Sequence, residues 1–165
     1  IADSGFCNDR SLSTRSNNGD GAHVTGGYTY YDGADRYSNH KPNLVCSNST
    51  NDLFTTNTAT IGNKVLIYPI GLITVDELML GGLADEYMNR SSYTYSSYTY
   101  WTMTPRHFGV SGNKADEFHV SSLGYTSSTG VTNGNGVRGV INLKSNVEIS
   151  GGIGTANNPF VVKVE

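Results

Sequence analysis

The most distinctive stretch of the chain is Ser91-Ser-Tyr-Thr-Tyr-Ser-Ser-Tyr-Thr-Tyr-Trp-Thr-Met-Thr104, which places four tyrosines beside the single tryptophan. Its last part, Tyr100–Thr104, has the aromatic and β-branched composition of a strand, and Pro105 is expected to end that strand. Side chains alternate between the two faces of a strand, so Trp101 is predicted to anchor the core while the flanking threonines point the other way.

The four tyrosines of this stretch indicate a recognition surface, which we expect to centre on Tyr93, Tyr95, Tyr98 and Tyr100. Tyrosine offers a large amphipathic contact area at low entropic cost, and serine adapts its hydrogen bonds to a partner. The competing interpretation is two β-strand edges rich in good strand formers, with the rings packed under neighbouring loops.

Length and charge limit the possible functions. The chain has 165 residues, which predicts one domain over 1–165. Charged residues make up 15% of it, the net charge is −3, and no basic stripe is present, so nucleic acid is not an expected partner. No apolar run is long enough to cross a bilayer, which predicts no membrane insertion by this chain. Because the chain begins with Ile1, we expect it to have been processed or cut from a longer one.

The two cysteines, Cys7 and Cys46, are expected to form a disulfide. Neither belongs to a Cys-x-x-Cys motif, which disfavours a zinc site. The bond would close a loop of about 40 residues and stabilise it by roughly 3–4 kcal/mol. Residues 1–60 are loop-rich, and the stretch between the cysteines has few apolar residues, so it needs such a crosslink. A disulfide implies an oxidising, extracytoplasmic compartment, whereas two free thiols remain the alternative.

A short helix is predicted over 74–80. Thr74 and Glu77 have the spacing of a capping box, and Gly81-Gly82 follows as a stop. The carboxylates of Asp76 and Glu77 are explained as helix caps rather than as catalytic groups. The apolar stretch before the helix, 64–73, is predicted to be a buried strand with a break at Pro69.

The remaining pattern is one of short strands separated by turns. Residues 83–99 are expected to form an exposed excursion, and 129–136 a turn-rich loop. The segment 117–121 alternates polar and apolar residues, as a half-buried strand does. Further strands are predicted at 28–31, 137–144, 147–149 and 159–164, the last of which is expected to close the domain. The fold class is therefore α+β and β-rich, with one or two short helices, long loops and its core in 61–165.

Several motifs together resemble one protein family. They are, in chain order, Gly71-Leu-Ile-Thr-Val-Asp-Glu-Leu78 with Gly81-Gly82, Tyr100-Trp-Thr-Met-Thr-Pro105, Gly136-Val-Arg-Gly-Val-Ile-Asn-Leu-Lys-Ser145 and Gly154-Thr-Ala-Asn-Asn-Pro-Phe-Val-Val162. The similarity extends to 1–10 and 51–54. The family comprises secreted or surface proteins of Gram-positive and gut bacteria, some of them pilin-like.

A broader resemblance is to the C-type-lectin-like fold, in its formylglycine-generating-enzyme and retroelement-diversified variants. It is carried by the Trp101 segment, the alternating strand at 117–121 and the closing Val-Arg-x-Val-Ile strand. The resemblance implies that ligand contacts come from Phe108–Gly136, a window that includes Tyr125. The calcium-binding triplets of sugar-binding lectins and the paired cysteines of the oxidase relatives are absent, and Gly139 stands where proline often follows the arginine. We therefore expect neither enzyme activity nor a calcium requirement.

No motif supports a catalytic centre, a metal or a cofactor. The four histidines lack metal-ligand spacing, and no Gly-x-Ser-x-Gly elbow is present. His107 directly precedes the window and His119 lies within it, and both are candidate ligand contacts. Arg138 lies in an apolar segment, where an ion pair or packing of its aliphatic stem is the favoured interpretation.

Two functional hypotheses remain, and both place the protein outside the cell or on its surface. The first is a non-enzymatic, adhesin-like recognition domain that binds a protein or a glycan through its tyrosine-rich loops. The second is a structural subunit of a pilus or surface filament, in which the same side chains contact neighbouring subunits.

Overall fold

A computed structural model describes residues 1–15, 27–84, 87–109, 114–155 and 157–163. These residues form two helices and eight strands, which confirms an α+β, β-rich fold. In chain order the elements are β1 (Phe6–Cys7), β2 (Tyr28–Tyr30), α1 (Asp32–Ser38), β3 (Leu53–Phe54), α2 (Val75–Leu80), β4 (Tyr100–Gly109), β5 (Lys114–Val120), β6 (Thr126–Gly130), β7 (Ile149–Gly151) and β8 (Val161–Val162).

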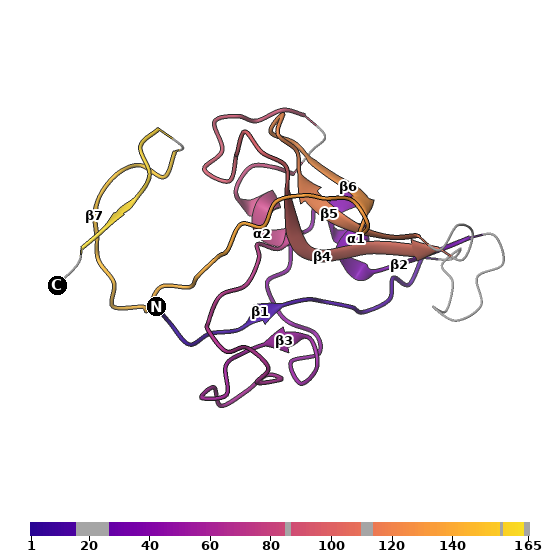
Figure 1. The fold of residues 1–165 in the computed structure, drawn as a ribbon, viewed down its shortest axis with the longest axis horizontal. Coiled ribbons are helices and arrows are strands. Elements are labelled where there is room, and N and C mark those ends of the chain that lie inside the picture. The colour runs from indigo at the N-terminus through magenta and orange to yellow at the C-terminus, as the bar shows by residue number, and fades with distance from the viewer. Residues whose placement is uncertain (16–26, 85–86, 110–113, 156, 164–165) are drawn as a thin grey trace.

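The centre of the fold is an antiparallel sheet of four strands in the order β2-β4-β5-β6 (Figure 1). β4 is its longest strand and pairs with β5 along most of its length, with register shifts on both sides of Pro105. Two smaller two-stranded sheets, β1-β3 and β7-β8, lie outside it. The β7-β8 ribbon stands away from the main body and is called the arm below (Figure 1).

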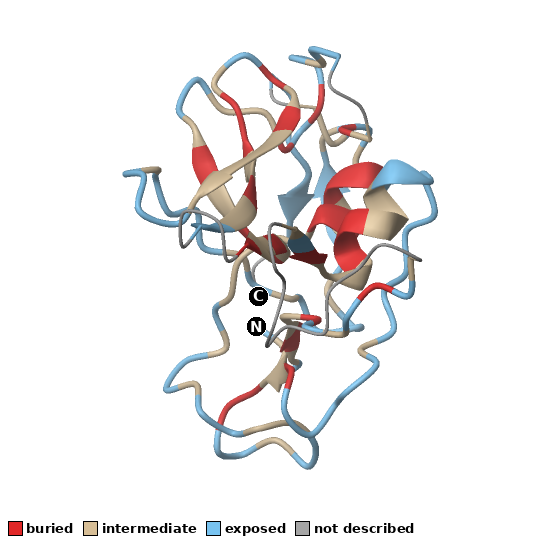
Figure 2. Ribbon diagram, turned by 90° about the vertical axis from the view of Figure 1, so that its right-hand side faces the viewer, coloured by how far each residue is buried: buried red, intermediate tan, exposed pale blue. Residues whose placement is uncertain are grey.

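Both helices pack on one face of the central sheet and supply half of the buried residues of its two core clusters (Figure 2). One cluster joins Ala34 of α1 and Val75 of α2 to Phe118 of β5. A second joins Leu78 of α2 to Tyr100 at the start of β4, together with Val120 and Leu83. These side chains alternate with outward-facing ones along β4 and β5, as a half-buried sheet requires.

The N-terminus of α2 is fixed by the predicted capping box. The Thr74 hydroxyl accepts a hydrogen bond from the backbone N–H of Glu77 at 3.1 Å, and the Glu77 carboxylate accepts from the N–H of Thr74 at 2.8 Å. These bonds satisfy two donors that a helix leaves unpaired at its start. Gly81 is the C-cap, so both predicted limits of the helix are confirmed.

α1 lies against β4 because a glycine lets the two backbones approach. A Cβ on Gly33 would come within 2.5 Å of the Thr104 methyl group. The helix lies within residues 1–60, which were predicted to be loop-rich and in which no helix was located; Asp32, Asp35 and Arg36 occupy positions in it that suit the helix dipole. The expected strand just before it, at 28–31, is present as β2.

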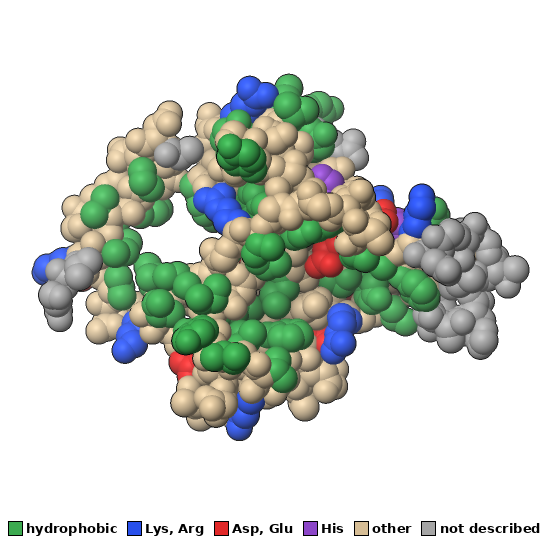
Figure 3. All heavy atoms as spheres, viewed as in Figure 1, with side chains coloured by type: hydrophobic (Ala, Val, Ile, Leu, Met, Phe, Trp, Pro, Cys, Tyr) green, Lys and Arg blue, Asp and Glu red, His purple; other side chains and the backbone are tan. Residues whose placement is uncertain are grey.

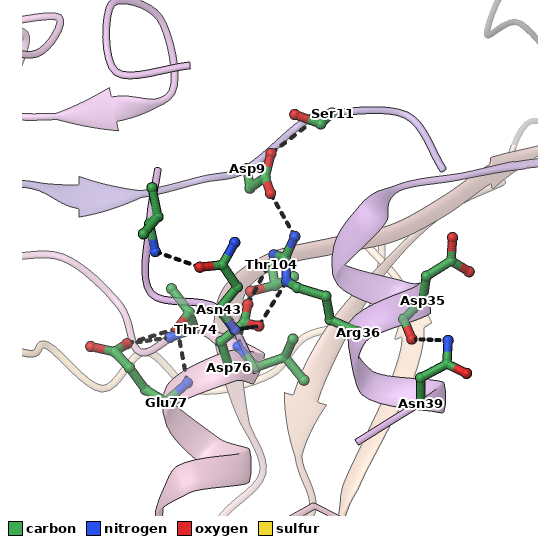
Figure 4. A network of polar contacts seen from close by, with 12 residues as sticks. Asp9, Ser11, Asp35, Arg36, Asn39, Asn43, Thr74, Asp76, Glu77 and Thr104 are labelled. Atoms are coloured by element: carbon green, nitrogen blue, oxygen red, sulfur yellow. Dashed lines mark hydrogen bonds and ion pairs between the residues drawn. The ribbon is translucent and has the colours of Figure 1, made fainter. Parts of the chain in front are cut away.

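A buried ion-pair cluster holds the two helices and the N-terminal segment together (Figure 4). Arg36 of α1 donates two hydrogen bonds to Asp76 of α2, at 2.8 and 2.9 Å, and a third to Asp9 at 2.8 Å. Asp76 also accepts the backbone N–H of Asn43 at 2.9 Å. Asp76 is therefore a buried tertiary contact rather than only a helix cap, which extends the interpretation made from the sequence.

The predicted disulfide is present. Cys7 of β1 and Cys46 are joined at an S–S distance of 2.08 Å. Nearby, β1 pairs with β3, and Arg10 forms an ion pair with the buried Asp52. The bond ties a long, mostly exposed loop to β1, and it indicates that the protein folds in an oxidising, extracytoplasmic environment.

Three expected strands are not formed as predicted. Residues 64–73 make an exposed to half-buried loop with only isolated bridges, such as Gly71 with Val140. Residues 137–144 run as an extended segment with the same single bridge, and Leu143 is exposed. The last strand is reduced to β8, which pairs with β7 in the arm and does not close the domain.

The predicted facing of the tryptophan strand was wrong. Thr102 and Thr104, the neighbours of Trp101 and Met103 on β4, are buried, and Trp101 is only half-buried on the opposite face. The hydroxyl of Thr102 donates to the Phe118 carbonyl at 2.8 Å, and that of Thr104 accepts from the Val75 N–H at 2.9 Å. Strand β4 also continues through Pro105 to Gly109 rather than ending at the proline.

The ion-pair cluster gives a test of the fold. Arg36→Ala would leave Asp9 and Asp76 buried without their cation, and we expect a loss of about 3–5 kcal/mol in the free energy of unfolding. Urea denaturation monitored by Trp101 fluorescence would measure it. The control is Lys163→Ala, which removes an ion pair with Glu148 whose side chains are both largely exposed, and which should cost less than about 1 kcal/mol. Equal losses for the two variants would contradict a structural role of Arg36.

Candidate binding surface

Some tyrosine rings of the tyrosine-rich loop are exposed on the surface, and one is buried in the core. Tyr98 is 78% exposed, Tyr93 is 52% exposed, and Tyr95 is half-buried. Tyr100 is only 4% exposed and belongs to the core cluster. The expectation that the surface centres on all four rings is therefore corrected, and three of them are available to a partner.

The loop is held by its small hydroxyl residues rather than by its tyrosines. Ser92 and Thr94 are buried on either side of the exposed Tyr93. The Ser92 hydroxyl donates to the Gly81 carbonyl at the end of α2, at 2.9 Å, and lies 2.7 Å from that of Thr94. The alternation of small polar residues inward and tyrosines outward gives the loop a fixed course over the end of α2.

Arg138 also holds the tyrosine-rich loop in place, through bonds to its backbone. Its guanidinium donates to the carbonyl oxygens of Thr94, at 2.8 Å, and Tyr93, at 3.4 Å. Its central carbon lies 5.4 Å from the centroid of the Tyr100 ring, within the range of a cation–π contact. The Tyr100 hydroxyl donates to the same Thr94 carbonyl. Of the two roles expected for Arg138, an ion pair or packing of its aliphatic stem, the ion pair is not found among the described residues.

Two hollows meet at Arg138. The outer hollow, of about 570 Å³, is lined by Tyr93, Tyr95, Arg138, Gly154, Thr155, Pro159 and Phe160. The inner hollow, of about 370 Å³, reaches past Glu77 and Tyr100 toward Val140. Figure 3 shows the opening between the arm and the main body, which the outer hollow borders. A volume of this order is typical of small-molecule sites.

Tyr95 links the outer hollow to the turn between β5 and β6. A Cβ on Gly124 would lie 3.2 Å from the Tyr95 ring, so this glycine allows the ring to pack against the turn. The next residue, Tyr125, is half-buried, and its carbonyl accepts the Ser121 N–H at 2.8 Å. Tyr125 thus adjoins the packing site of Tyr95 along the chain, but it does not line the outer hollow.

His107 lies at the other end of the sheet and does not join the tyrosine loop. It is buried between the rings of Tyr28 and Tyr30, at centroid distances of 4.5 and 5.1 Å, and its Nε2 is 3.5 Å from Asp116. Burial lowers the pKa of His107, an effect that Asp116 opposes. A hollow of about 710 Å³ adjoins it, bordered also by Arg106.

His119 lies on the outer face of the sheet beside Trp101. The two residues are paired across β4 and β5, and their rings meet edge to face at 6.1 Å. Glu117, two residues earlier on β5, shares this face. Burial lowers the pKa of His119 and raises the pKa of Glu117. Figure 3 shows histidine and acidic side chains on this face, over β4 and β5.

The described residues contain no group of three or more His, Cys, Asp or Glu side chains that could hold a metal ion. Within the same part of the chain, no helix is both long and apolar enough to cross a membrane. The chemistry on offer at the outer hollow is thus aromatic contact, one guanidinium and a few hydroxyl groups.

Comparisons with models of known families, with curated proteins and with solved structures give no match to this chain. The candidate surface therefore stands on its own geometry.

Sequence reasoning found the tyrosines but missed their partners. Arg138 was expected to form an ion pair or to pack its aliphatic stem, and Phe160 to lie in a closing strand, whereas both line the outer hollow. The sequence did show that Arg138 is a single cation in an apolar segment. Its hydrogen-bond partners could not be predicted from that, because more than 40 residues separate Arg138 from the carbonyls that it binds.

The outer sheet face predicts a pH dependence of stability with two opposed contributions. The unfolded chain protonates His119 near its ordinary pKa of 6.5 while the folded protein resists it, so stability falls as pH drops below about 6.5. Glu117 has the opposite effect. Above its ordinary pKa of 4.5, the folded protein retains a proton on Glu117 that the unfolded chain loses, so stability falls as the pH rises.

Urea denaturation at several pH values between 4.5 and 7 separates the two contributions. His119→Gln should flatten the rise of unfolding free energy with pH, and Glu117→Gln should steepen it. The two variants serve as controls for each other, since both are near-isosteric and both lie on β5. Slopes that are unchanged in both variants would show that neither side chain is desolvated in the folded protein.

Proposed function

We propose that this protein is an extracellular, non-enzymatic recognition domain of C-type-lectin-like type, which binds a glycan or protein ligand at the outer hollow. The observation that carries the proposal is the arrangement of Tyr93 and Tyr95 around Arg138, on a loop that buried hydroxyl groups hold in place. Rings held on a fixed loop lose little entropy when a ligand binds, which favours affinity.

Exposure supports the same proposal. Tyr93 and Tyr98 both expose more than half of their surface, and Phe160 on the facing arm is 60% exposed. Clustered exposed aromatic residues usually mark interaction sites. The disulfide agrees with a protein that works outside the cytoplasm, which the proposal extends to the cell surface or the medium.

Arrays of glycans and of peptides test the recognition function. The wild-type protein is expected to bind members of at least one array, and the double variant Tyr93→Ala/Tyr95→Ala should lose at least tenfold in affinity while its melting curve shows that it stays folded. Tyr68→Ala is the matched control, because Tyr68 is 69% exposed and does not line the outer hollow. Binding that survives the double variant, or no binding on either array, would contradict the proposal.

A second candidate function, a subunit of a surface filament, is favoured by the arm alone. Ile149, Ile153 and Val161 are each more than half exposed there. A two-stranded ribbon also presents strand edges that another chain can pair with.

Sedimentation velocity at rising protein concentration tests the filament hypothesis. Reversible assembly that Ile153→Asp abolishes would support a subunit role, because a charge at this exposed position opposes apolar contact between copies. The corresponding control is Ile67→Asp, at a site that is 86% exposed and lies in the 64–73 loop. A monomer at all concentrations would exclude self-assembly through the arm.

A further inference from the structure

We propose that the outer hollow binds a carboxylate-bearing sugar, a uronic or sialic acid unit, with Arg138 as the partner of the carboxylate. The inference rests on the proposed recognition function and names the chemical class of its ligand. It depends on three properties of the hollow in the part of the chain that the structure describes: a cation without an acidic partner, a lining without a carboxylate, and aromatic walls.

Arg138 is a cation without an acidic partner among the described residues. It differs in this from Arg10, Arg15 and Arg36, each of which forms an ion pair with an aspartate. Its bonds to the Thr94 and Tyr93 carbonyls fix the guanidinium at the rim of the hollow. A guanidinium has five N–H donors in a planar fork, so donors remain for a ligand. A carboxylate matches this fork with two parallel hydrogen bonds, as a phosphate does.

Among the described residues, the lining of the outer hollow contains no carboxylate. The described lining of the adjoining inner hollow includes one acid, Glu77. Its carboxylate is already engaged by the backbone and the hydroxyl of Thr74, at 2.8 and 2.9 Å, in the capping box. An acidic ligand is therefore attracted on the outer side of Arg138 and repelled on the inner side.

The walls fit a sugar ring. Tyr93, Tyr95 and Phe160 present aromatic surface, and the flat apolar face of a pyranose packs on such rings while its hydroxyls stay in water. Gly154 has φ +78°, and a Cβ there would come within 2.5 Å of the Phe160 ring, so this glycine allows the ring to lie against the backbone of the arm. The volume of about 570 Å³ suits one or two sugar units.

An extended peptide is disfavoured by the hydrogen bonding of the arm. A bound strand needs free main-chain donors and acceptors along an edge. In the turn that borders the hollow, the N–H of Thr155 donates to the Asn158 carbonyl at 3.2 Å, and the reverse bond is 3.1 Å long. The N–H of Ile153 donates to the same Asn158 carbonyl. A ligand in the outer hollow would therefore be bound by side chains rather than by the backbone of this turn, as sugars commonly are.

The test is an NMR titration with N-acetylneuraminic acid and methyl glucuronide, and with methyl glucoside as the neutral counterpart. At least one acid should bind at least tenfold more tightly than the neutral sugar. Arg138→Gln should abolish that preference, and a melting curve of this variant shows whether the loop stays folded.

A second pair of variants leaves Arg138 untouched. Pro159→Glu places a carboxylate in the lining at an exposed position, where it can pair with Arg138, and should weaken acid binding at least tenfold relative to Pro159→Gln. The glutamine variant makes the same change of backbone and size without the charge, so the difference between the two reports on charge alone.

The outcomes separate this inference from the function on which it rests. Acid preference with the expected effect of Pro159→Glu supports the inference. Tyrosine-dependent binding of neutral sugars or of peptides, without acid preference, overturns it while the recognition function stands. No binding of either acid, together with empty arrays, overturns both.

Discussion

The ion-pair cluster of Arg36 with Asp9 and Asp76 is the interaction on which the rest of the structure depends. It joins α1, α2 and the N-terminal segment at one point, and through Asp76 it also holds the backbone at Asn43. The large buried apolar side chains of the helices, Val75, Leu78 and Met79, all lie on α2, whereas α1 buries only Gly33 and Ala34, which fill little volume. Because α1 has so little apolar contact of its own, the directional bonds of Arg36 to Asp76 and Asp9 contribute strongly to its position.

The position of the candidate surface depends on the ion-pair cluster through helix α2. The helix is set by its capping box and by Asp76 at one end, and its last turn carries the Gly81 carbonyl that anchors Ser92. The tyrosine-rich loop is thus attached to the end of an element that is itself fixed in the core. Arg138 then holds the loop from the far side through two carbonyl oxygens. The result is a set of exposed rings whose supporting backbone is connected to the core by specific bonds.

Short sequence motifs predicted secondary structure well, but they predicted poorly which side chains are buried and which residues contact one another in the fold. The helix at 74–80 followed from Thr74 and Glu77 because a capping box involves only residues within one turn. The facing of Trp101 was wrong because hydrophobicity favours tryptophan inside, whereas the buried side of β4 needs small residues where α1 approaches, and its threonines find hydrogen-bond partners there. The exposed tyrosines were predictable from composition. Arg138 and Phe160 were not, because their role depends on how the last third of the chain folds back.

In the tyrosine-rich loop, the residues that hold the backbone in place differ from the residues whose side chains face solvent. This difference has a consequence for protein engineering. The bonds that fix the course of the loop come from Ser92, Thr94 and the backbone carbonyls of residues 93 and 94. The side chains at 93 and 98 face solvent and carry none of those bonds. Randomising these outward positions while keeping Ser92 and Thr94 would give a library of binding proteins on an unchanged backbone, in the way that antibody frameworks carry variable loops.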